Sequence, residues 1–218
     1  MKTAETTVIT ISRLLGSGGS YLGHQIAKRL GYKYADREIL RQAALQLGAE
    51  EDSLVGRDER ISSFWENLLW TFGGVTSPEA YVPPPLRLVD DRELQRTEAG
   101  IIRGIASRYD AVIIGRGGAH ILQEQPNVVK VFVHAPREFR LRRVMELYNI
   151  TSVDEARAEM DKADRERKKA ARSWFGVYFG DARLYDLCIN TEASGFALAE
   201  EMVVRLVEQK KRNRSSAE

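Results

Sequence analysis

Glycines gather near the start of the chain, between a short β-branched run and an apolar pattern of helical spacing. Residues 16–20 (GSGGS) follow residues 8–11, which are typical of a buried strand, and precede the amphipathic stretch 22–30. In such a loop the backbone N–H groups turn inward, and the first turn of the helix adds N–H groups of its own. We therefore expect a cradle for a nucleotide phosphate. The alternative, a tight turn without a ligand, needs fewer glycines.

The loop differs at two positions from the Walker A pattern G-x-x-x-x-G-K-[ST]. When Gly18 is aligned with the second glycine, Ser20 takes the position of the hydroxyl that meets Mg²⁺. Gly19 then takes the place of the lysine, and Arg13 takes that of the first glycine. Because the lysine normally contacts the β- and γ-phosphates, we expect Arg13, the nearest cation, to replace it.

Composition sets limits on the class of protein. The chain has 218 residues, 43% hydrophobic and 29% charged, which fits one globular α/β domain with a small insertion. The net charge of +2 argues against a nucleic-acid-coating protein. The polar N-terminus and the lack of a long apolar run predict no membrane span. The single cysteine, Cys188, excludes a disulfide within the chain and fits a cytoplasmic protein.

Four further short apolar runs read as strands, and helical patterns separate them. We expect these strands at residues 32–36, 110–114, 127–135 and 185–190. The main helices are expected at residues 37–47, 90–109, from 136 onward, 154–172 and 195–211. This alternation predicts about five parallel strands with right-handed crossovers.

Polar or glycine residues follow several of these strands. They are Arg13 with the glycine loop, Asp36 and Arg37, the turn 115–117, and Asn190. Because the carboxyl ends of parallel strands meet at one edge, where open α/β sheets bind ligands, this edge is the expected site. Asp36 can also act locally, since it is well placed to cap the following helix.

The segment 154–172 carries many charges of both signs. Its arginines suit phosphoryl transfer, because a planar guanidinium binds two phosphate oxygens and keeps its proton. The alternative is a solvated helix face held by pairs of opposite charge one turn apart. The three histidines are scattered, and we expect each to be structural.

Six stretches together resemble the cytidylate kinase-like family of nucleoside monophosphate kinases. They are ITISRLLGSGGSYLGHQIAKRLG, YADREIL, VIIGRGGAHIL, VVKVFVHAPREFRLRRV, ADRERKKAARSWFG and LYDLCINT. The resemblance implies a three-layer αβα P-loop NTPase fold with a helical monophosphate-binding insertion and a short lid. It also implies transfer of the γ-phosphoryl group of ATP, with Mg²⁺, to a nucleoside monophosphate, typically CMP or dCMP.

The expected boundaries and roles follow from this resemblance and the motifs. One domain over residues 1–218 has its core at 8–36, 90–145 and 183–211, its insertion at 37–89 and its lid at 150–180. The residues expected to bind ATP phosphates are Gly16, Ser17, Gly18, Gly19, Ser20, Tyr21, Arg140 and Arg143, with Ser20 near Mg²⁺. Those expected at the acceptor are Asp36, Arg37, Arg116 and Asp164. Those expected to be catalytic are Arg13, Arg165 and Arg172.

Two other functions stay open at this point. One is a P-loop kinase for another small acceptor. The other is a nucleotide-binding regulatory module whose catalysis is weak because the loop lysine is absent. In all three cases the expected partners are nucleotides rather than nucleic acid or membranes, and the protein is expected to be a monomer or a homodimer.

Overall fold

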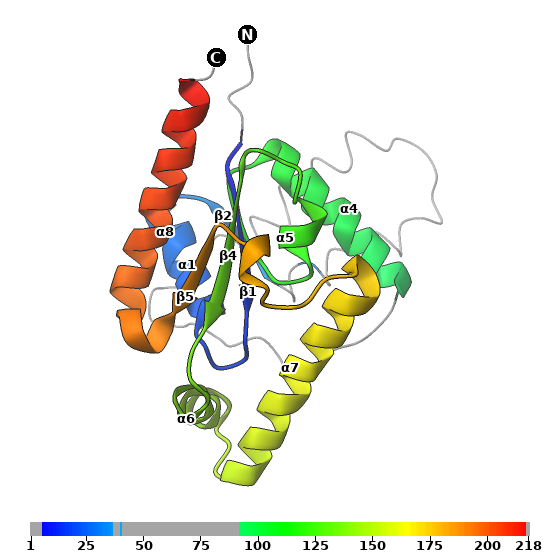
Figure 1. Ribbon diagram of the computed structural model, residues 1–218, viewed down its shortest axis with the longest axis vertical. Coiled ribbons are helices and arrows are strands. Elements are labelled where there is room, and N and C mark those ends of the chain that lie inside the picture. The colour runs from blue at the N-terminus through cyan, green and yellow to red at the C-terminus, as the bar shows by residue number, and fades with distance from the viewer. Residues whose placement is uncertain (1–5, 37–39, 41–91, 217–218) are drawn as a thin grey trace.

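A parallel sheet of five strands forms the centre of the molecule. The computed structural model describes residues 6–36, 40 and 92–216. The sheet order is β2-β3-β1-β4-β5 (Figure 1). The strands are β1 (Val8–Arg13), β2 (Lys33–Ala35), β3 (Ala111–Ile114), β4 (Val128–His134) and β5 (Leu187–Asn190).

The central strand, β1, is buried along all of its six residues. It pairs with β3 on one side and β4 on the other, so that Ile9 lies between Val112 and Val129. A strand covered on both faces and both edges favours β-branched residues, which pack well on a pleated surface. This packing fixes the position of the loop that follows Arg13.

Helices cover both faces of the sheet (Figure 1). On one face, α1 (Gly19–Leu30) and α8 (Thr191–Ser215) share a core with the strands, in which Leu22, Ile26 and Val203 are fully buried. On the other face, α4 (Arg92–Arg108) buries Ile102 and Ile105, next to the short helix α5 (Gly118–Ile121). The result is a three-layer α/β fold, as expected.

Two helices lie beyond the carboxyl ends of the strands, where the glycine loop also lies (Figure 1). They are α6 (Arg137–Tyr148) and the long α7 (Val153–Phe175), and a short 3-10 turn, η1 (Ala182–Leu184), precedes β5. The Ser152 hydroxyl caps α7 by accepting from the Glu155 N–H, and Gly176 ends it in the left-handed conformation. These two helices are the elements that can reach the loop.

The predicted alternation of strands and helices is confirmed, with differences at the helix ends. The first helix begins at Gly19, so the last two residues of the predicted glycine loop, 16–20, are already helical. The last helix begins at Thr191, capped by Asn190, and is interrupted at Gly195, where the sequence pattern predicts its start. The short helix α5 has no counterpart among the predicted elements.

The predicted insertion at 37–89 lies outside the described residues, apart from Leu40. The division into core, insertion and lid therefore stays a prediction. Among the helices that the structure describes, none has the length and apolar character needed to cross a membrane.

Candidate functional site

The glycine loop leaves backbone N–H groups without partners. β1 ends at Arg13, and the N-cap of α1 is Gly18, which has φ 80° and no side chain to cap the first turn. Within the described part of the chain, no hydrogen-bond acceptor is present for the N–H groups of Gly16, Gly18, Gly19 and Ser20. Unsatisfied N–H groups at the start of a helix attract anions.

The inner side of the loop is bonded to the sheet. The Ser17 side chain is fully buried, with its hydroxyl 2.8 Å from the Leu14 carbonyl oxygen and 3.1 Å from that of Val133. The Thr191 hydroxyl lies 2.7 Å from the Ser17 carbonyl oxygen and 3.3 Å from that of His134. The Ser17 N–H also donates to the Leu14 carbonyl oxygen, at 3.3 Å. These contacts fix the loop on β4 and on the start of α8, and the predicted contact of Ser17 with a phosphate stays a prediction.

Arg13 occupies space that the Walker A pattern gives to a lysine. A Cβ atom added to Gly19 would lie 2.7 Å from the Cβ of Arg13, closer than real Cβ atoms approach. The Arg13 guanidinium lies against Gly115 at the end of β3, where an added Cβ would overlap it. The cation and the glycine have thus exchanged places relative to that pattern, and each requires the other.

A second guanidinium, that of Arg167 on α7, is close enough to Arg13 for the two charges to repel. Its Nη1 donates to Oδ1 of Asp164 at 3.1 Å. Burial, and then the charge of Arg13, lower the pKa of Arg167 to about 10. Two cations held near each other beside the loop favour the binding of an anion, because the anion relieves their repulsion.

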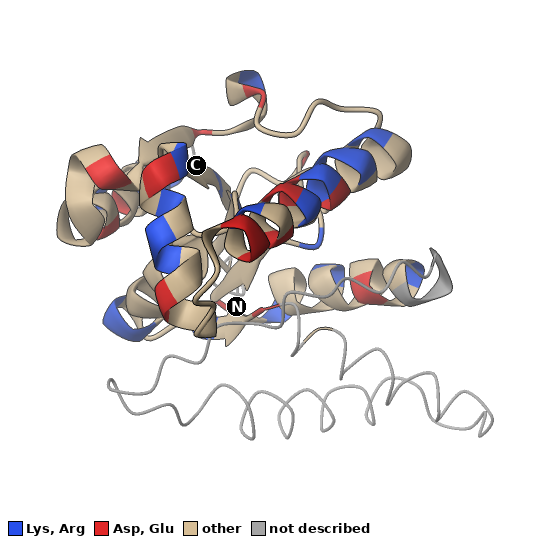
Figure 2. Ribbon diagram, turned by 90° about the horizontal axis from the view of Figure 1, so that it is seen from below, with Lys and Arg blue, Asp and Glu red and all other residues tan. Residues whose placement is uncertain are grey.

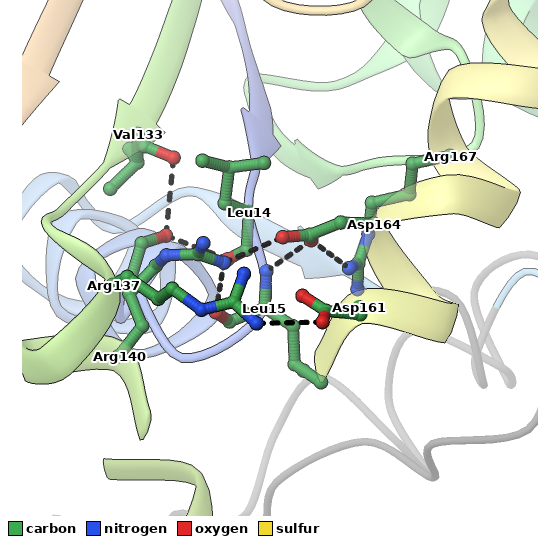
Figure 3. A network of polar contacts seen from close by, with 9 residues as sticks. Leu14, Leu15, Val133, Arg137, Arg140, Asp161, Asp164 and Arg167 are labelled. Carbon is green, nitrogen blue, oxygen red and sulfur yellow. Dashed lines mark hydrogen bonds and ion pairs between the residues drawn. The ribbon is translucent and has the colours of Figure 1, made fainter. Parts of the chain in front are cut away.

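Asp164 is buried at the beginning of the loop (Figure 3). Its Oδ1 accepts the Leu15 N–H at 2.9 Å, and its Oδ2 accepts Nη1 of Arg140 at 2.6 Å. The same Nη1 of Arg140 lies 3.1 Å from the Leu15 carbonyl oxygen. Asp164 and Arg140 therefore bond to each other and to the loop backbone, and their predicted contacts with acceptor and phosphate stay predictions.

Arg143 belongs to an aromatic cluster at the loop. Its guanidinium lies over the rings of Phe196, at 4.8 Å, and Phe139, at 5.8 Å, and its buried Nε has no partner in the described part of the chain. The Phe196 ring also packs edge-on against Tyr21, at 5.1 Å, and rests on Gly18. Three predicted phosphate contacts, Arg143, Tyr21 and Gly18, thus meet around Phe196.

Arg116 follows β3 and is held by α4. Its Nε donates to Oε1 of Glu98 at 2.9 Å, its Nη2 forms an ion pair with the same oxygen, and the Glu98 side chain is 2% exposed. The backbone of Arg116 has φ 50°, between Gly115 and Gly117, which also have positive φ. This unusual turn carries Arg116 at the carboxyl edge of the sheet, beside the strand that carries Arg13.

The remaining predicted site residues are Arg165 and Arg172 on α7, and Asp36 and Arg37 after β2. Arg165 and Arg172 are exposed on α7, and the Arg172 guanidinium lies 4.7 Å from the Tyr178 ring centroid. Asp36 follows β2 and is partly buried, and its expected roles as a helix cap and an acceptor contact stay predictions. Arg37 lies outside the described residues. The structure does not bring Arg165 or Arg172 to the loop.

Three residues at the site escaped the sequence analysis. They are Glu98, Thr191 and Phe196. Arg167 was expected only as one of the arginines in or beside the lid, although the pattern sets it apart from Arg165 and Arg172: Ala156, Met160 and Ala163 mark the buried face of α7, and Arg167 continues it one turn after Ala163. Phe196 and Thr191 come from a helix start that only the fold brings to the loop.

Ser20 is the protein group predicted to lie near Mg²⁺, and its setting fits that role. Within the described residues, no group of three or more His, Cys, Asp or Glu side chains could hold a metal ion. Ser20 lies on the first turn of α1 and is 7% exposed. Its hydroxyl suits an ion that arrives with a nucleotide, since such an ion is held mainly by phosphates and water.

Comparison with known proteins assigns the family. The family model described as "Cytidylate kinase-like family" matches residues 8–193. This chain belongs to the cytidylate kinase-like family. A cytidylate kinase from Methanosarcina mazei is 24% identical over 188 residues, which cover 84% of this chain and 87% of that protein. Membership supports a kinase that acts on a nucleotide or another small molecule.

Solved structures agree on the fold. An uncharacterized protein from Eubacterium ventriosum matches with a TM-score of 0.68 and 21% identity, over 93% of this chain and 99% of that one. A gluconokinase from Sinorhizobium meliloti matches with a TM-score of 0.50 and 17% identity, over 97% and 99% of the two chains. At these identities the likeness concerns the P-loop kinase fold alone.

Proposed function

We propose that this member of the cytidylate kinase-like family transfers the γ-phosphoryl group of Mg-ATP to a nucleoside monophosphate, with CMP or dCMP as the acceptor. The observation that carries the proposal is the set of unsatisfied N–H groups at Gly16, Gly18, Gly19 and Ser20, with the aliphatic part of Arg13 packed against Gly19 and its guanidinium at the end of β3. The family match and the names of the archaeal relatives support the nucleotide as substrate.

The donor occupies the loop. Its phosphates accept hydrogen bonds from the loop N–H groups, and the Ser20 hydroxyl meets the Mg²⁺ that arrives with ATP. Arg143, whose Nε has no partner among the described residues, lies over the Phe196 ring that packs on Gly18, and it adds a cation for the phosphates. Arg13 supplies the positive charge that the lysine of a Walker A loop would otherwise supply.

The acceptor occupies the other side of Arg13, toward the end of β3. Arg116, Asp36 and Arg37 contribute contacts there, and Glu98 keeps the Arg116 guanidinium in one orientation. A guanidinium that is already oriented loses less entropy when it binds a phosphate. The transferred phosphoryl group then lies between the two substrates, within reach of Arg13 and Arg167.

Transfer needs charge and alignment rather than covalent help from the protein. The attacking oxygen, the phosphorus and the leaving oxygen are in line, and negative charge on the equatorial oxygens is balanced by Mg²⁺ and by arginines. Closure of the lid expected at residues 150–180 excludes water that would otherwise hydrolyse ATP. Because Asp164 holds its part of α7 on the loop, the end of α7 after Asp164 moves, and it brings Arg165 and Arg172 toward the substrates.

A panel of acceptors tests the proposal. Steady-state turnover is measured with Mg-ATP and each of CMP, dCMP, UMP, AMP and GMP, and we expect the highest kcat/KM for CMP or dCMP. Equal rates for all five would remove the cytidylate assignment. One feature favours another acceptor. The family resemblance leads us to expect an acidic residue after Arg116 to contact the base, and this chain has Gly117 there.

The second candidate function, a regulatory module with weak catalysis, is favoured by glycine at the lysine position. Tight ATP binding by calorimetry, without transfer to any acceptor or to water, would support it over the kinase. A cytoplasmic location and a monomeric or homodimeric state stay predictions of the sequence.

A further inference from the structure

Two side chains from different helices hold the backbone around Leu15. Asp164 of α7 accepts the Leu15 N–H at 2.9 Å, and Arg140 of α6 donates to the Leu15 carbonyl oxygen at 3.1 Å. The two side chains also pair with each other at 2.6 Å, and both residues are less than 10% exposed. Hydrogen bonds with charged partners in a buried setting hold their geometry strongly.

Holding the Leu15 carbonyl fixes the next N–H group. The carbonyl of Leu15 and the N–H of Gly16 belong to one planar peptide unit, which is trans, so they point in opposite directions. When Arg140 holds that carbonyl, the Gly16 N–H must point away from Arg140. This N–H is one of those without an acceptor in the described part of the chain.

Packing seats both helices on the same part of the loop. The Leu15 side chain shares a buried cluster with Leu141 of α6 and Met160 of α7. Gly16 has φ 80°, and a Cβ added to it would lie 2.5 Å from the Arg140 carbonyl oxygen, so the backbone of α6 touches the loop directly. A shift of either helix therefore moves the peptide between Leu15 and Gly16.

We propose that Asp164 and Arg140 are positioning residues, which aim the Gly16 N–H at the donor phosphates and tie α7 to the loop. The proposal rests on the proposed function, because it takes the loop as the donor site. It gives Asp164 a role different from the acceptor contact expected from the sequence. Arg167 also donates to the Asp164 carboxylate, so the same side chain holds this second cation in place.

The test compares three variants. Asp164→Ala removes the contact, and Asp164→Asn keeps the shape but places an amide beside Arg140. Asp161→Asn, one turn earlier on α7, is the matched control, because Asp161 pairs with Arg137 on the surface (Figure 3). For each variant, amide hydrogen exchange at Leu15 is measured by NMR without nucleotide, the Kd for ATP by calorimetry, and KM for CMP by kinetics.

Asp164→Ala is expected to speed exchange at Leu15 and to raise the Kd for ATP about tenfold, as expected for one lost charged hydrogen bond. KM for CMP is expected to change by less than about twofold, since positioning of the donor loop does not touch the acceptor. Asp164→Asn should raise the Kd for ATP by a smaller factor, and Asp161→Asn should match the wild type. If Asp164→Ala does not fold, the Kd for ATP and the exchange rate at Leu15 in Asp164→Asn are the measurements that test the proposal.

Two results would overturn the proposal. One is an unchanged Kd for ATP with a raised KM for CMP, which would make Asp164 an acceptor contact. The other is exchange at Leu15 equal to that of the control. If the wild type binds no ATP, the proposed function fails by itself, while exchange at Leu15 and the chemical shift of the Gly16 amide still decide whether Asp164 positions the loop.

Discussion

The glycine loop and α7 both present groups that attract an anion at the carboxyl ends of the strands, but the groups differ in kind. In the loop they are backbone N–H groups, which are exposed by the turn that the glycines form. On α7 they belong to long side chains, and acidic and basic residues alternate along the helix (Figure 2). One face of α7 packs inward through Met160, Ala163 and Asp164, while Arg165 and Arg172 are exposed.

The two regions differ in how far their anion-binding groups depend on tertiary packing. The N–H groups of Gly18, Gly19 and Ser20 belong to a helix start, so the local turn sets their direction, and only the Gly16 N–H also depends on contacts from α6 and α7. A side chain on a helix acts only if the helix packs with that side chain toward the site. The inward Arg167 and the outward Arg165 make this contrast testable within one helix.

The largest effect is expected from the loop cation. Arg13→Ala should lower kcat by about 10²–10³-fold, because a charge placed where negative charge develops contributes that much to phosphoryl and acyl transfer. Circular dichroism is expected to show an intact fold. The measurement is kcat with saturating ATP and CMP, and a nearly normal kcat would refute the replacement of lysine by Arg13.

A reciprocal exchange sharpens this prediction. Gly19→Lys alone is expected to destabilise the protein, because the new Cβ would meet the Cβ of Arg13 at 2.7 Å. Arg13→Gly combined with Gly19→Lys restores the Walker A arrangement and should recover a large part of the lost kcat. No recovery in a folded double variant would mean that Arg13 acts in another way.

The next largest effect is expected from Arg167, on the inward face of α7, in comparison with Arg165 on the exposed face. Arg167→Gln should reduce kcat by about 10–10²-fold, since it removes the cation whose charge interacts with that of Arg13. Arg165→Gln, on the exposed face of the same turn, is the matched comparison and should have the smaller effect. The kcat values of the two variants are compared under identical conditions. A larger loss for Arg165→Gln would indicate that α7 turns or closes before transfer.

Glycine positions in and outside the loop provide a third comparison. Gly16 and Gly31 both have positive φ, but only Gly16 has the α6 backbone against it. Gly31→Ala should lower the free energy of unfolding by about 1 kcal/mol and leave ATP binding unchanged. Gly16→Ala should cost about 2–3 kcal/mol and also weaken ATP binding. Chemical denaturation and calorimetry measure the two quantities, and equal effects at both positions would contradict the contact between α6 and the loop.

The smallest expected effect concerns pH. An ordinary guanidinium keeps its proton, but burial and Arg13 lower the pKa of Arg167 to about 10, so about half of this residue is neutral at pH 10 in the free protein. A bound anion favours the charged form, so ATP affinity should fall with rising pH, by about twofold when half of Arg167 is neutral. Calorimetry between pH 8 and 10 should show a shallower decline in Arg167→Gln. Equal slopes for the two proteins would assign the titration to other groups.

The sequence predicted the parts of the molecule that depend on local pattern. Residues 8–11 and 128–133 are apolar and β-branched, so their strands and the order of strand, loop and helix could be predicted. The glycines at 16, 18 and 19 marked the loop, because a turn that binds nothing needs fewer of them. The neighbours of the loop could not be predicted in this way.

Those neighbours come from parts of the chain more than a hundred residues away. Asp164 reaches Leu15, and Phe196 reaches Gly18, only because of how α7 and α8 pack. The local sequence does not distinguish an aspartate that accepts a backbone N–H, as Asp164 does, from an aspartate that binds a substrate. The spacing of Arg167 from Ala163 was the one local hint, and it depends on knowing which face of α7 is buried.

The central claim is that the N–H groups of the loop bind the phosphates of ATP. The direct measurement is an NMR titration of the ¹⁵N-labelled protein with Mg-ATP, followed at the amides of Gly16, Gly18, Gly19 and Ser20, with Gly31 and Gly176 as reference glycines. We expect large, saturable shifts at the four loop amides and small shifts at the two references. Saturable ATP binding without shifts at the loop amides, or with equal shifts at the reference glycines, would contradict the account.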